Sequence, residues 1–248
     1  MTAPRLFVPH QLSVGATGVF DRMQIRQLRT VLRMAGGERV TLFDGTGVEA
    51  DALYVPTGKD AATFEVVEMS TPEREPPIHL TVGLALLRGE RFEFALQKLT
   101  EIGVACIVPL AAQRCVVSFD VAREWPRRRE RYERIIREAA EQSERLTLVA
   151  LESPVPPSEF FGRQPTIALI ERADAVHIAD VVLIRELAIA IGPEGGWTDR
   201  ERDAFQNTCG ISGSLGSLIL RAETAAIVAA GTLVQRAWAT RWGESSEL

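Results

Sequence analysis

Hydrophobic and polar positions alternate through much of the first seventy residues, and this two-residue period is typical of half-buried β-strands. Residues 39–43 read Arg-Val-Thr-Leu-Phe, and residues 63–67 read Thr-Phe-Glu-Val-Val. Between them, a turn at 44–47 (Asp-Gly-Thr-Gly) leads into a further extended stretch at 48–55. One short helix is expected around 23–34. Short strands joined by turns, together with a single helix, predict a small β-barrel.

The pattern changes after residues 71–77, a polar and proline-rich segment that we interpret as a domain linker. Strands and helices then alternate, which predicts a parallel sheet covered by helices on both faces. The expected strands are 78–87, 104–110, 166–170, 187–191 and 211–215, and the expected helices are 90–102, 127–145 and 222–238. The sequence therefore predicts an α/β protein with two domains, residues 1–72 and residues 73–248.

Composition indicates the cellular compartment of the protein. No stretch of about 18 uncharged apolar residues occurs, so we expect no membrane span. The first ten residues lack the apolar run and the small-residue cleavage site of a secretory signal. The three cysteines, Cys106, Cys115 and Cys209, are too few and too widely spaced for a disulfide framework or a metal pair. Together these features predict a cytoplasmic protein.

Charge does not decide the partner. The formal net charge is −5, which by itself disfavours nucleic acid, but only Lys59 and Lys98 are lysines and the other basic residues are arginines. Arginine suits phosphate binding because of its planar fork, although codon bias also explains this usage. Arginines recur every three or four residues along the first predicted helix and would share one broad face. That face fits either phosphate contact or a solvated surface.

The segment 189–201 joins an apolar strand to a helix through glycines. Its centre reads Gly-Pro-Glu-Gly-Gly at 192–196, and Thr198 and Glu201 then have the spacing of a capping box. Glycines at the carboxyl end of a strand let a ligand approach the backbone, and open α/β sheets bind ligands at that end. The spacing matches neither GxGxxG nor a P-loop. A tight strand-to-helix turn explains the glycines equally well.

A second segment, 215–225, reads Leu-Gly-Ser-Leu-Ile-Leu-Arg-Ala-Glu-Thr-Ala. Three apolar residues, 218–220, precede Arg221 and then a pair, Glu223-Thr224, that opens an alanine-rich helix. Such a run suits the flat face of an adenine. The alternative is that the three apolar side chains fill the core.

Taken together, the two segments resemble the 16S rRNA (uracil-N3) methyltransferase family, and the match extends over nearly the whole chain. Further matching segments are 31–34, 42–45, 88–94, 97–98, 101–103, Pro109, 114–115, 138–142 and Arg145. The sequence departs from the usual family pattern at Gln27, Glu144, Val149 and Leu218. Leu218 stands where an arginine is common, which removes a cation close to the expected site.

The resemblance implies a PUA-like RNA-binding β-barrel over 1–72 and a SPOUT domain over 73–248 that contains a deep trefoil knot near 165–235. It implies S-adenosylmethionine as cofactor, 16S rRNA in the small ribosomal subunit as partner, and a homodimer. The final helix is apolar enough to serve as the dimer contact. The implied cofactor-binding residues are Leu169, Glu171, Ile191, Gly192, Pro193, Glu194, Gly195, Gly196, Leu215, Gly216, Ile219 and Leu220.

Roles in the reaction follow from its chemistry. A uridine N3 carries a proton, so charge develops on O2 and O4 as the proton leaves, and Arg221 is the candidate that stabilises this charge. Glu194 is the candidate base, while Glu223 is expected to serve the helix amino terminus. We expect no metal site, since His10, His79 and His177 are isolated. The candidate RNA-binding residues are Arg22, Arg26, Arg29, Arg33, Arg88 and Arg114.

Two other interpretations compete with this one. A SPOUT enzyme that methylates tRNA or a ribose 2′-hydroxyl would share the fold. A non-catalytic RNA-binding protein would retain the fold without activity, and Leu218 is the residue that best supports it. Binding of S-adenosylmethionine distinguishes a methyltransferase from the non-catalytic protein, because a binding module has no need of this cofactor. A hydrolase is disfavoured, since the sequence contains no G-x-S-x-G elbow.

Overall fold

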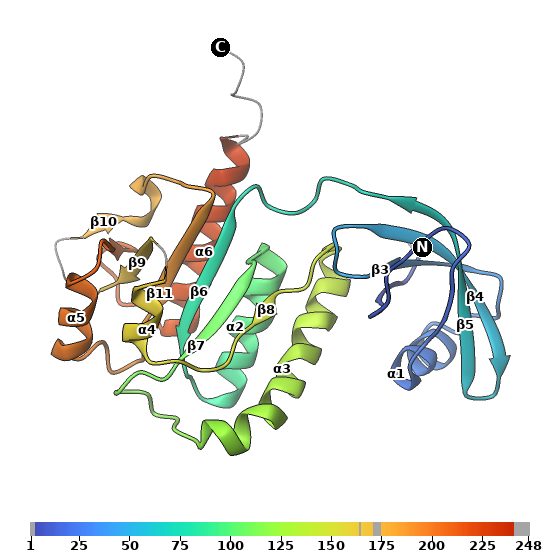
Figure 1. Cartoon of the computed structure of the whole chain (residues 1–248), viewed down its shortest axis with the longest axis horizontal. Helices are drawn as coiled ribbons and strands as arrows, with labels where there is room; N and C mark the ends of the chain where they lie inside the picture. The colour runs from blue at the N-terminus through green and yellow to red at the C-terminus, as the bar shows by residue number, and fades with distance from the viewer. Residues whose placement is uncertain (1–2, 164, 171–174, 241–248) are drawn as a thin grey trace, which may run out of the picture. The chain divides into compact units, whose positions relative to one another are not determined.

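In a computed structural model, described for residues 3–163, 165–170 and 175–240, the chain forms two compact units (Figure 1). The amino-terminal unit comprises residues 1–75 and 140–148, and the carboxyl-terminal unit comprises residues 76–139 and 149–248. The elements in chain order are β1 (Arg5–Phe7), β2 (Thr17–Val19), α1 (Arg22–Arg26), η1 (Gln27–Val31), β3 (Arg39–Phe43), β4 (Glu49–Gly58), β5 (Ala61–Ser70), β6 (His79–Ala85), α2 (Gly89–Ile102), β7 (Cys106–Leu110), α3 (Val121–Gln142), β8 (Ala150–Leu151), α4 (Pro157–Phe161), β9 (Thr166–Leu169), β10 (Val176–His177), η2 (Ile178–Asp180), β11 (Glu186–Ile191), α5 (Asp199–Gln206), β12 (Ile211–Ser214) and α6 (Ala222–Ala239).

The amino-terminal unit contains a five-stranded sheet in the order β1-β3-β4-β5-β2. β1 pairs in parallel with β3, and the other neighbours are antiparallel. The three strands expected from alternation are confirmed as β3, β4 and β5, and β4 and β5 extend further to form a long hairpin. Along β4, the alternate residues Ala50, Ala52 and Tyr54 are buried in the core of this unit, so the two-residue period does select its inner face.

The helix expected at 23–34 is shorter and irregular. Asp21 caps it and forms a capping box with Gln24, but after Arg26 the chain continues as a π-helix through Val31. A π-turn has more residues per turn than an α-helix, so the expected alignment of all four arginines on one face is wrong. Leu28, within the π segment, is fully buried against the sheet.

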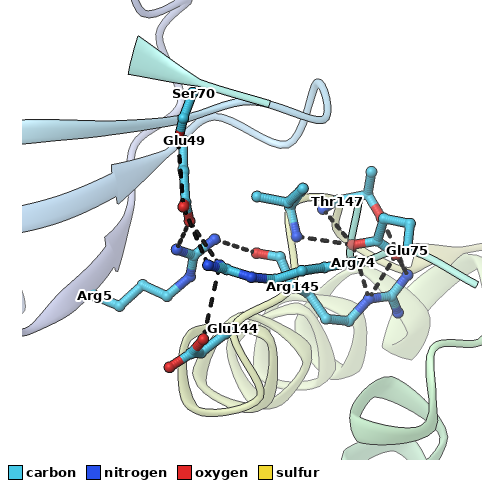
Figure 2. Close-up of polar contacts among 9 residues, drawn as sticks. Arg5, Glu49, Ser70, Arg74, Glu75, Glu144, Arg145 and Thr147 are labelled. Atoms are coloured by element: carbon cyan, nitrogen blue, oxygen red, sulfur yellow. Dashed lines mark hydrogen bonds and ion pairs between the residues drawn. The ribbon is translucent and has the colours of Figure 1, made fainter. Parts of the chain in front are cut away.

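Residues 140–148 belong to the amino-terminal unit, and polar contacts bind them there (Figure 2). Arg145 Nη2 donates to Glu75 Oε2 at 2.7 Å, and the Arg145 carbonyl oxygen accepts from Arg5 Nη2 at 2.7 Å. Arg5 also forms an ion pair with Glu49. Because Arg145 is only 6% exposed, these contacts lie in a poorly solvated environment where each one is stronger than in water.

This arrangement corrects the expected helix 127–145. The helix begins at Val121, ahead of Pro126, and Asp120 accepts a hydrogen bond from Arg123 N in its first turn. It ends at Gln142, and Glu144 then adopts a left-handed φ of 59°. The chain turns there because Arg145 contributes both its side chain and its carbonyl to contacts that a continuing helix would prevent.

The carboxyl-terminal unit is built on a seven-stranded sheet, entirely parallel, in the order β10-β12-β9-β11-β6-β7-β8. Successive residues of β11 face opposite sides. Ile189 packs in a core with α2, α3 and α6, whereas Ala188 and Ala190 pack in a second core with α4 and α5. Helices therefore cover both faces of the sheet, as expected for a parallel sheet whose strands are apolar throughout (Figure 1).

Among the described helices, none combines the length and the apolar character that crossing a membrane requires.

Candidate active site

The segments expected to bind a cofactor follow three neighbouring strands. β9 lies between β12 and β11, and Leu169 at its end pairs with Ile191 of β11. Because the carboxyl ends of parallel strands meet at one edge, the loops 192–196 and 215–220 begin on either side of Leu169. Glu171, which was also expected here, lies outside the described residues.

Trp197 fixes the loop 192–196. Its indole is buried, and Nε1 donates to the Leu169 carbonyl oxygen at 2.9 Å, which joins this loop to the end of β9. Gly192 makes room for the ring, since a Cβ on that residue would lie 2.9 Å from Cε2 of Trp197. Trp197 received no role from the sequence alone. Its one local signal is an aromatic residue directly after a glycine run, and that signal does not identify its partner.

A second support comes from the start of α5 and the segment after β7. The expected capping box is confirmed, because Thr198 Oγ1 accepts from Glu201 N at 3.3 Å and Glu201 Oε2 accepts from Thr198 N at 2.8 Å. Glu201 Oε1 also accepts the backbone N–H of Gln113 at 2.9 Å. Arg114 Nη1 donates to the Gly195 carbonyl oxygen at 3.0 Å. The segment after β7 thus fixes the glycine loop in place.

The loop 215–220 presents apolar side chains to the surface. Leu218 is 79% exposed and Ile219 is 61% exposed, so these two residues do not fill the core. Leu215, by contrast, packs against the larger core. Gly216 has a φ of 100°, a left-handed conformation that glycine adopts without strain.

The backbone at two of the glycines is accessible to a ligand. A Cβ built on Gly196 or Gly216 would meet no described atom within 4 Å beyond its chain neighbours. Open glycine backbone at one loop, and open glycine backbone with the exposed apolar Leu218 and Ile219 at the other, suit a molecule that combines a flat ring with polar ribose and amino-acid groups. S-adenosylmethionine has this composition, so the residues present fit the cofactor.

Arg91, in the first turn of α2, connects the glycine loop to the start of α6. Its Nη1 donates to Glu194 Oε1 at 3.2 Å, and its Nε lies 3.8 Å from Glu223 Oε1. In the sequence, Arg91 stands out only as part of a matching segment. Arg221, at the N-cap of α6, is exposed, and its side chain forms no hydrogen bond or ion pair with the part of the chain that the structure describes. The two candidate catalytic residues therefore differ, since only Glu194 has a partner.

The structure distributes the candidate RNA-binding arginines over different environments. Arg22 and Arg26 are exposed on α1, whereas Arg29 donates to the carbonyl oxygens of Gly58 and Lys59 at the β4–β5 turn. The remaining candidates are Arg33, which has a left-handed φ of 57°, Arg88, which is the N-cap of α2, and Arg114, which contacts the glycine loop. Only Arg22 and Arg26 are thus both exposed and close together on one helix.

No metal centre is visible in residues 3–163, 165–170 and 175–240, where histidine, cysteine, aspartate and glutamate form no group of three or more with suitable geometry. Cys106 is buried near Glu152, and this burial together with the carboxylate raises the pKa of its thiol to about 12. A thiol with this pKa is not a nucleophile near neutral pH.

Comparison with known proteins identifies the family of the chain. The family model of the RNA methyltransferase domain matches residues 74–234. The ribosomal RNA small subunit methyltransferase E of Synechocystis is 31% identical over 243 residues, covering 92% of this chain and 76% of the relative. The Bacillus subtilis protein of the same name is 29% identical over 231 residues, covering 88% of this chain and 90% of the relative.

Solved structures agree over almost the full length. The ribosomal RNA small subunit methyltransferase E from Neisseria gonorrhoeae, bound to S-adenosylmethionine, superimposes with a TM-score of 0.85 at 30% identity and covers 95% of this chain and 98% of its own. A methyltransferase from Legionella pneumophila, also in complex with S-adenosylmethionine, gives a TM-score of 0.87 at 29% identity and covers 97% and 98% of the two chains.

Proposed function

The chain belongs to the RNA methyltransferase family that contains ribosomal RNA small subunit methyltransferase E, and from this we propose that it methylates N3 of a specific uridine in 16S rRNA. The protein is an S-adenosylmethionine-dependent rRNA methyltransferase. The observation that carries the proposal is the convergence of the glycine loop 192–196 and the apolar loop 215–220 at one edge of a parallel sheet, with Arg221 directly after the second loop.

The mechanism we propose depends mainly on positioning. S-adenosylmethionine supplies an electrophilic methyl group when it is bound. The loops 192–196 and 215–220 would hold the cofactor through backbone groups, and the exposed apolar pair Leu218 and Ile219 would offer a surface for its adenine. A nucleophile aligned in this way reacts much faster than one in solution, because the entropy of bringing the groups together has already been lost on binding. Arg221 is exposed and donates to uracil O2 or O4 as negative charge develops there.

The experiment that tests this function is methyl transfer to small ribosomal subunits isolated from cells that lack the protein. We expect one methyl group per subunit, mapped to N3 of a single uridine by mass spectrometry of nuclease fragments. Modification of a ribose 2′-hydroxyl or of tRNA would support the other SPOUT activities. Failure to bind S-adenosylmethionine in calorimetry would support a non-catalytic RNA-binding protein, for which the cation missing at Leu218 is the argument.

We also propose the finer features of the fold that family membership implies. The sheet of the amino-terminal unit corresponds to a PUA-like barrel that binds RNA, and residues 165–235 form the trefoil knot of a SPOUT domain. The position of β9 between β12 and β11 supports the knot, because the chain crosses between non-consecutive strands where the cofactor loops begin. The corresponding functional domains are residues 1–72 and 73–248.

A homodimer is the expected state in solution. The apolar residues of α6 that first suggested this contact, such as Ala229 and Leu233, are fully buried in the core of their own chain and therefore cannot contact a second one. Val228 and Trp238 are exposed large hydrophobic residues on the same helix, and a second copy of the chain would cover them. Light scattering at micromolar concentration should give twice the mass of one chain, and a single-chain mass would contradict the dimer.

RNA binding is expected to depend on Arg22 and Arg26. Replacing both with glutamine should lower the slope of log affinity against log salt by about 0.7–0.9 for each phosphate that is no longer neutralised. Binding to a 16S rRNA fragment, measured by fluorescence anisotropy at several salt concentrations, gives this slope. Affinity for S-adenosylmethionine should not change.

The matched control for this pair is Arg39→Gln, which removes an arginine of the same unit that is paired with Asp51. An unchanged slope in the Arg22→Gln, Arg26→Gln variant would show that RNA follows another path. Helix α3, which carries many arginines, would then be the next surface to test.

A further inference from the structure

The start of α6 contains a carboxylate that is incompletely satisfied. Glu223 is the second residue of this helix, and its side chain is only 10% exposed. One oxygen, Oε1, lies 3.8 Å from Arg91 Nε, which is an ion-pair distance but too long for a strong hydrogen bond. The other oxygen, Oε2, is buried and has no hydrogen-bond partner among the described residues. Buried polar atoms are nearly always paired, so a carboxylate oxygen without a partner among the described residues calls for an explanation in function.

The position of Glu223 connects it to the proposed active site. It lies two residues after Arg221, the residue proposed to contact uracil oxygens, and it shares Arg91 with Glu194 of the glycine loop. The three segments that carry Arg91, Glu194 and Glu223 are far apart in sequence, and one guanidinium joins them. Arg91 therefore fixes the carboxylate of Glu223 relative to the loop on which the cofactor is proposed to bind.

On the basis of the proposed function, we propose that Glu223 is the proton acceptor of the reaction and that Arg91 is its positioning residue. The N3 proton of the uracil passes to Oε2 of Glu223, and the electron pair left on N3 forms the bond to the methyl carbon. The carbon–sulfur bond breaks, and its electron pair stays on sulfur. The carboxylate and the sulfonium are both neutral afterwards. The step thus removes two opposite charges in a poorly solvated place, where an isolated charge is unfavourable.

Glu194, the base that the sequence suggested, is a weaker candidate on the same observations. Its Oε1 accepts from Arg91 Nη1 at 3.2 Å, and its side chain is three times as exposed as that of Glu223. The carboxylate of Glu194 is thus already engaged by the guanidinium of Arg91. Glu194 thus serves to hold Arg91 and the glycine loop together, while Glu223 retains an oxygen that can receive a proton.

The test compares Glu223→Gln with wild-type enzyme in single-turnover methyl transfer to small subunits. We expect the rate to fall by at least about 100-fold, within the range that general acid–base catalysis contributes. The midpoint of thermal unfolding and the affinity for S-adenosylhomocysteine and RNA should stay close to wild type. A substrate RNA with 5-fluorouridine at the target position has a more acidic N3, so it should restore the rate of Glu223→Gln by about tenfold or more relative to wild type.

A second readout does not depend on turnover. A carboxylate beside the reacting centre stabilises the positive sulfonium, so Glu223→Gln should reduce the preference for S-adenosylmethionine over S-adenosylhomocysteine by at least about threefold in calorimetry. The control is Glu90→Gln, which removes an exposed carboxylate beside Arg91. Should Glu223→Gln fail to fold, Glu223→Asp keeps the carboxylate, and it should retain the wild-type response to 5-fluorouridine at a lower rate.

Two outcomes overturn the inference. Methylation by Glu223→Gln at the wild-type rate would exclude Glu223 as the proton acceptor. A slow Glu223→Gln variant that 5-fluorouridine does not accelerate, with an unchanged preference between the two cofactor forms, would show that the residue is only structural. In both outcomes the wild-type enzyme would still methylate N3, so the proposed function would stand. Absence of N3 methylation by the wild type would instead refute the proposed function, and the inference with it.

Discussion

Replacing Gly192 with valine is expected to weaken binding of S-adenosylmethionine by about 100-fold. The added side chain would occupy the space of the Trp197 ring, because a Cβ on Gly192 already lies 2.9 Å from ring atom Cε2. Movement of the ring breaks the hydrogen bond from Trp197 Nε1 to the Leu169 carbonyl oxygen and leaves both groups unsatisfied. Loss of a buried hydrogen bond in this way costs about 1–3 kcal/mol, and each 1.4 kcal/mol is tenfold in affinity.

The measurement is calorimetric titration with S-adenosylmethionine, accompanied by circular dichroism to show that the variant is folded. Gly162→Val is the matched control, since Gly162 has an ordinary φ of −90° and a Cβ there would meet nothing within 4 Å. Gly195→Val should also weaken binding, because its Cβ would lie 3.0 Å from Arg114 Cβ. A folded Gly192→Val protein with wild-type affinity would show that the cofactor does not bind at this loop.

Local signals in the sequence predicted much of this loop. The glycine run, the Thr198 and Glu201 spacing and the apolar strand before them each depend on neighbouring residues alone, so a strand, a turn and a capped helix could be predicted. The order β12-β9-β11 could not be predicted in the same way, because a parallel sheet leaves the order of its strands open. The resemblance to a family implied only that Leu169, the loop 192–196 and the loop 215–220 share one cofactor site.

The residues that sequence reasoning missed act through tertiary contacts. Arg91 lies in a predicted helix, but nothing local indicates that it contacts Glu194 and Glu223, which lie more than one hundred residues away. Glu223 was expected to serve the helix terminus, a role that any acidic residue in a first turn fits. Its burial and its unpaired oxygen depend on how α2 packs against α6, which no sequence pattern records.

Dependence on tertiary contacts also explains why the sequence pattern placed the end of α3 too far along the chain. The apolar stripe of this helix ends at Ala140, and residues 141–145 are all polar, so periodicity does not locate the end of the helix among them. The actual end depends on Glu75, seventy residues earlier, whose carboxylate accepts from Arg145 and from the backbone N–H of Leu146 at 2.8 Å. A long-range ion pair thus overrides a local helical preference.

Replacing Arg145 with methionine is expected to destabilise the amino-terminal unit by about 3 kcal/mol, the lower end of the range for breaking a buried pair by removal of one partner. Arg145 Nη2 donates to Glu75 Oε2 at 2.7 Å and to Thr147 Oγ1 at 3.1 Å (Figure 2). Methionine fills similar space but leaves the partly buried carboxylate of Glu75 without its cation. Because this unit contains no tryptophan, hydrogen exchange of the β3, β4 and β5 amides is the suitable measurement, and it should accelerate by about 100-fold at neutral pH.

The destabilisation caused by Arg145→Met should depend on pH. Burial by itself raises the pKa of Glu75, but the hydrogen bonds and charge of Arg145, with the backbone N–H groups of Leu146 and Thr147, outweigh it and bring the pKa below its ordinary value of 4.5. A carboxylate with a lowered folded pKa contributes stability above its unfolded pKa and loses it as the pH falls through the folded pKa. The difference in the free energy of unfolding between wild type and Arg145→Met should therefore have its full size at pH 7 and become smaller below about pH 4.

Arg39→Met provides the matched control in the same unit, because Arg39 and Asp51 form an exposed pair that should contribute at most about 1 kcal/mol. The double variant Glu75→Gln, Arg145→Met should recover part of the lost protection, since it no longer holds an unpaired carboxylate in a partly buried position. If Arg145→Met exchanges no faster than Arg39→Met, residues 140–148 do not stabilise the amino-terminal unit, and residues 3–75 should fold without them. If Arg145→Met exchanges faster by the same factor at pH 7 and at pH 3, the lost stability comes from packing of the Arg145 side chain and not from its pairing with Glu75.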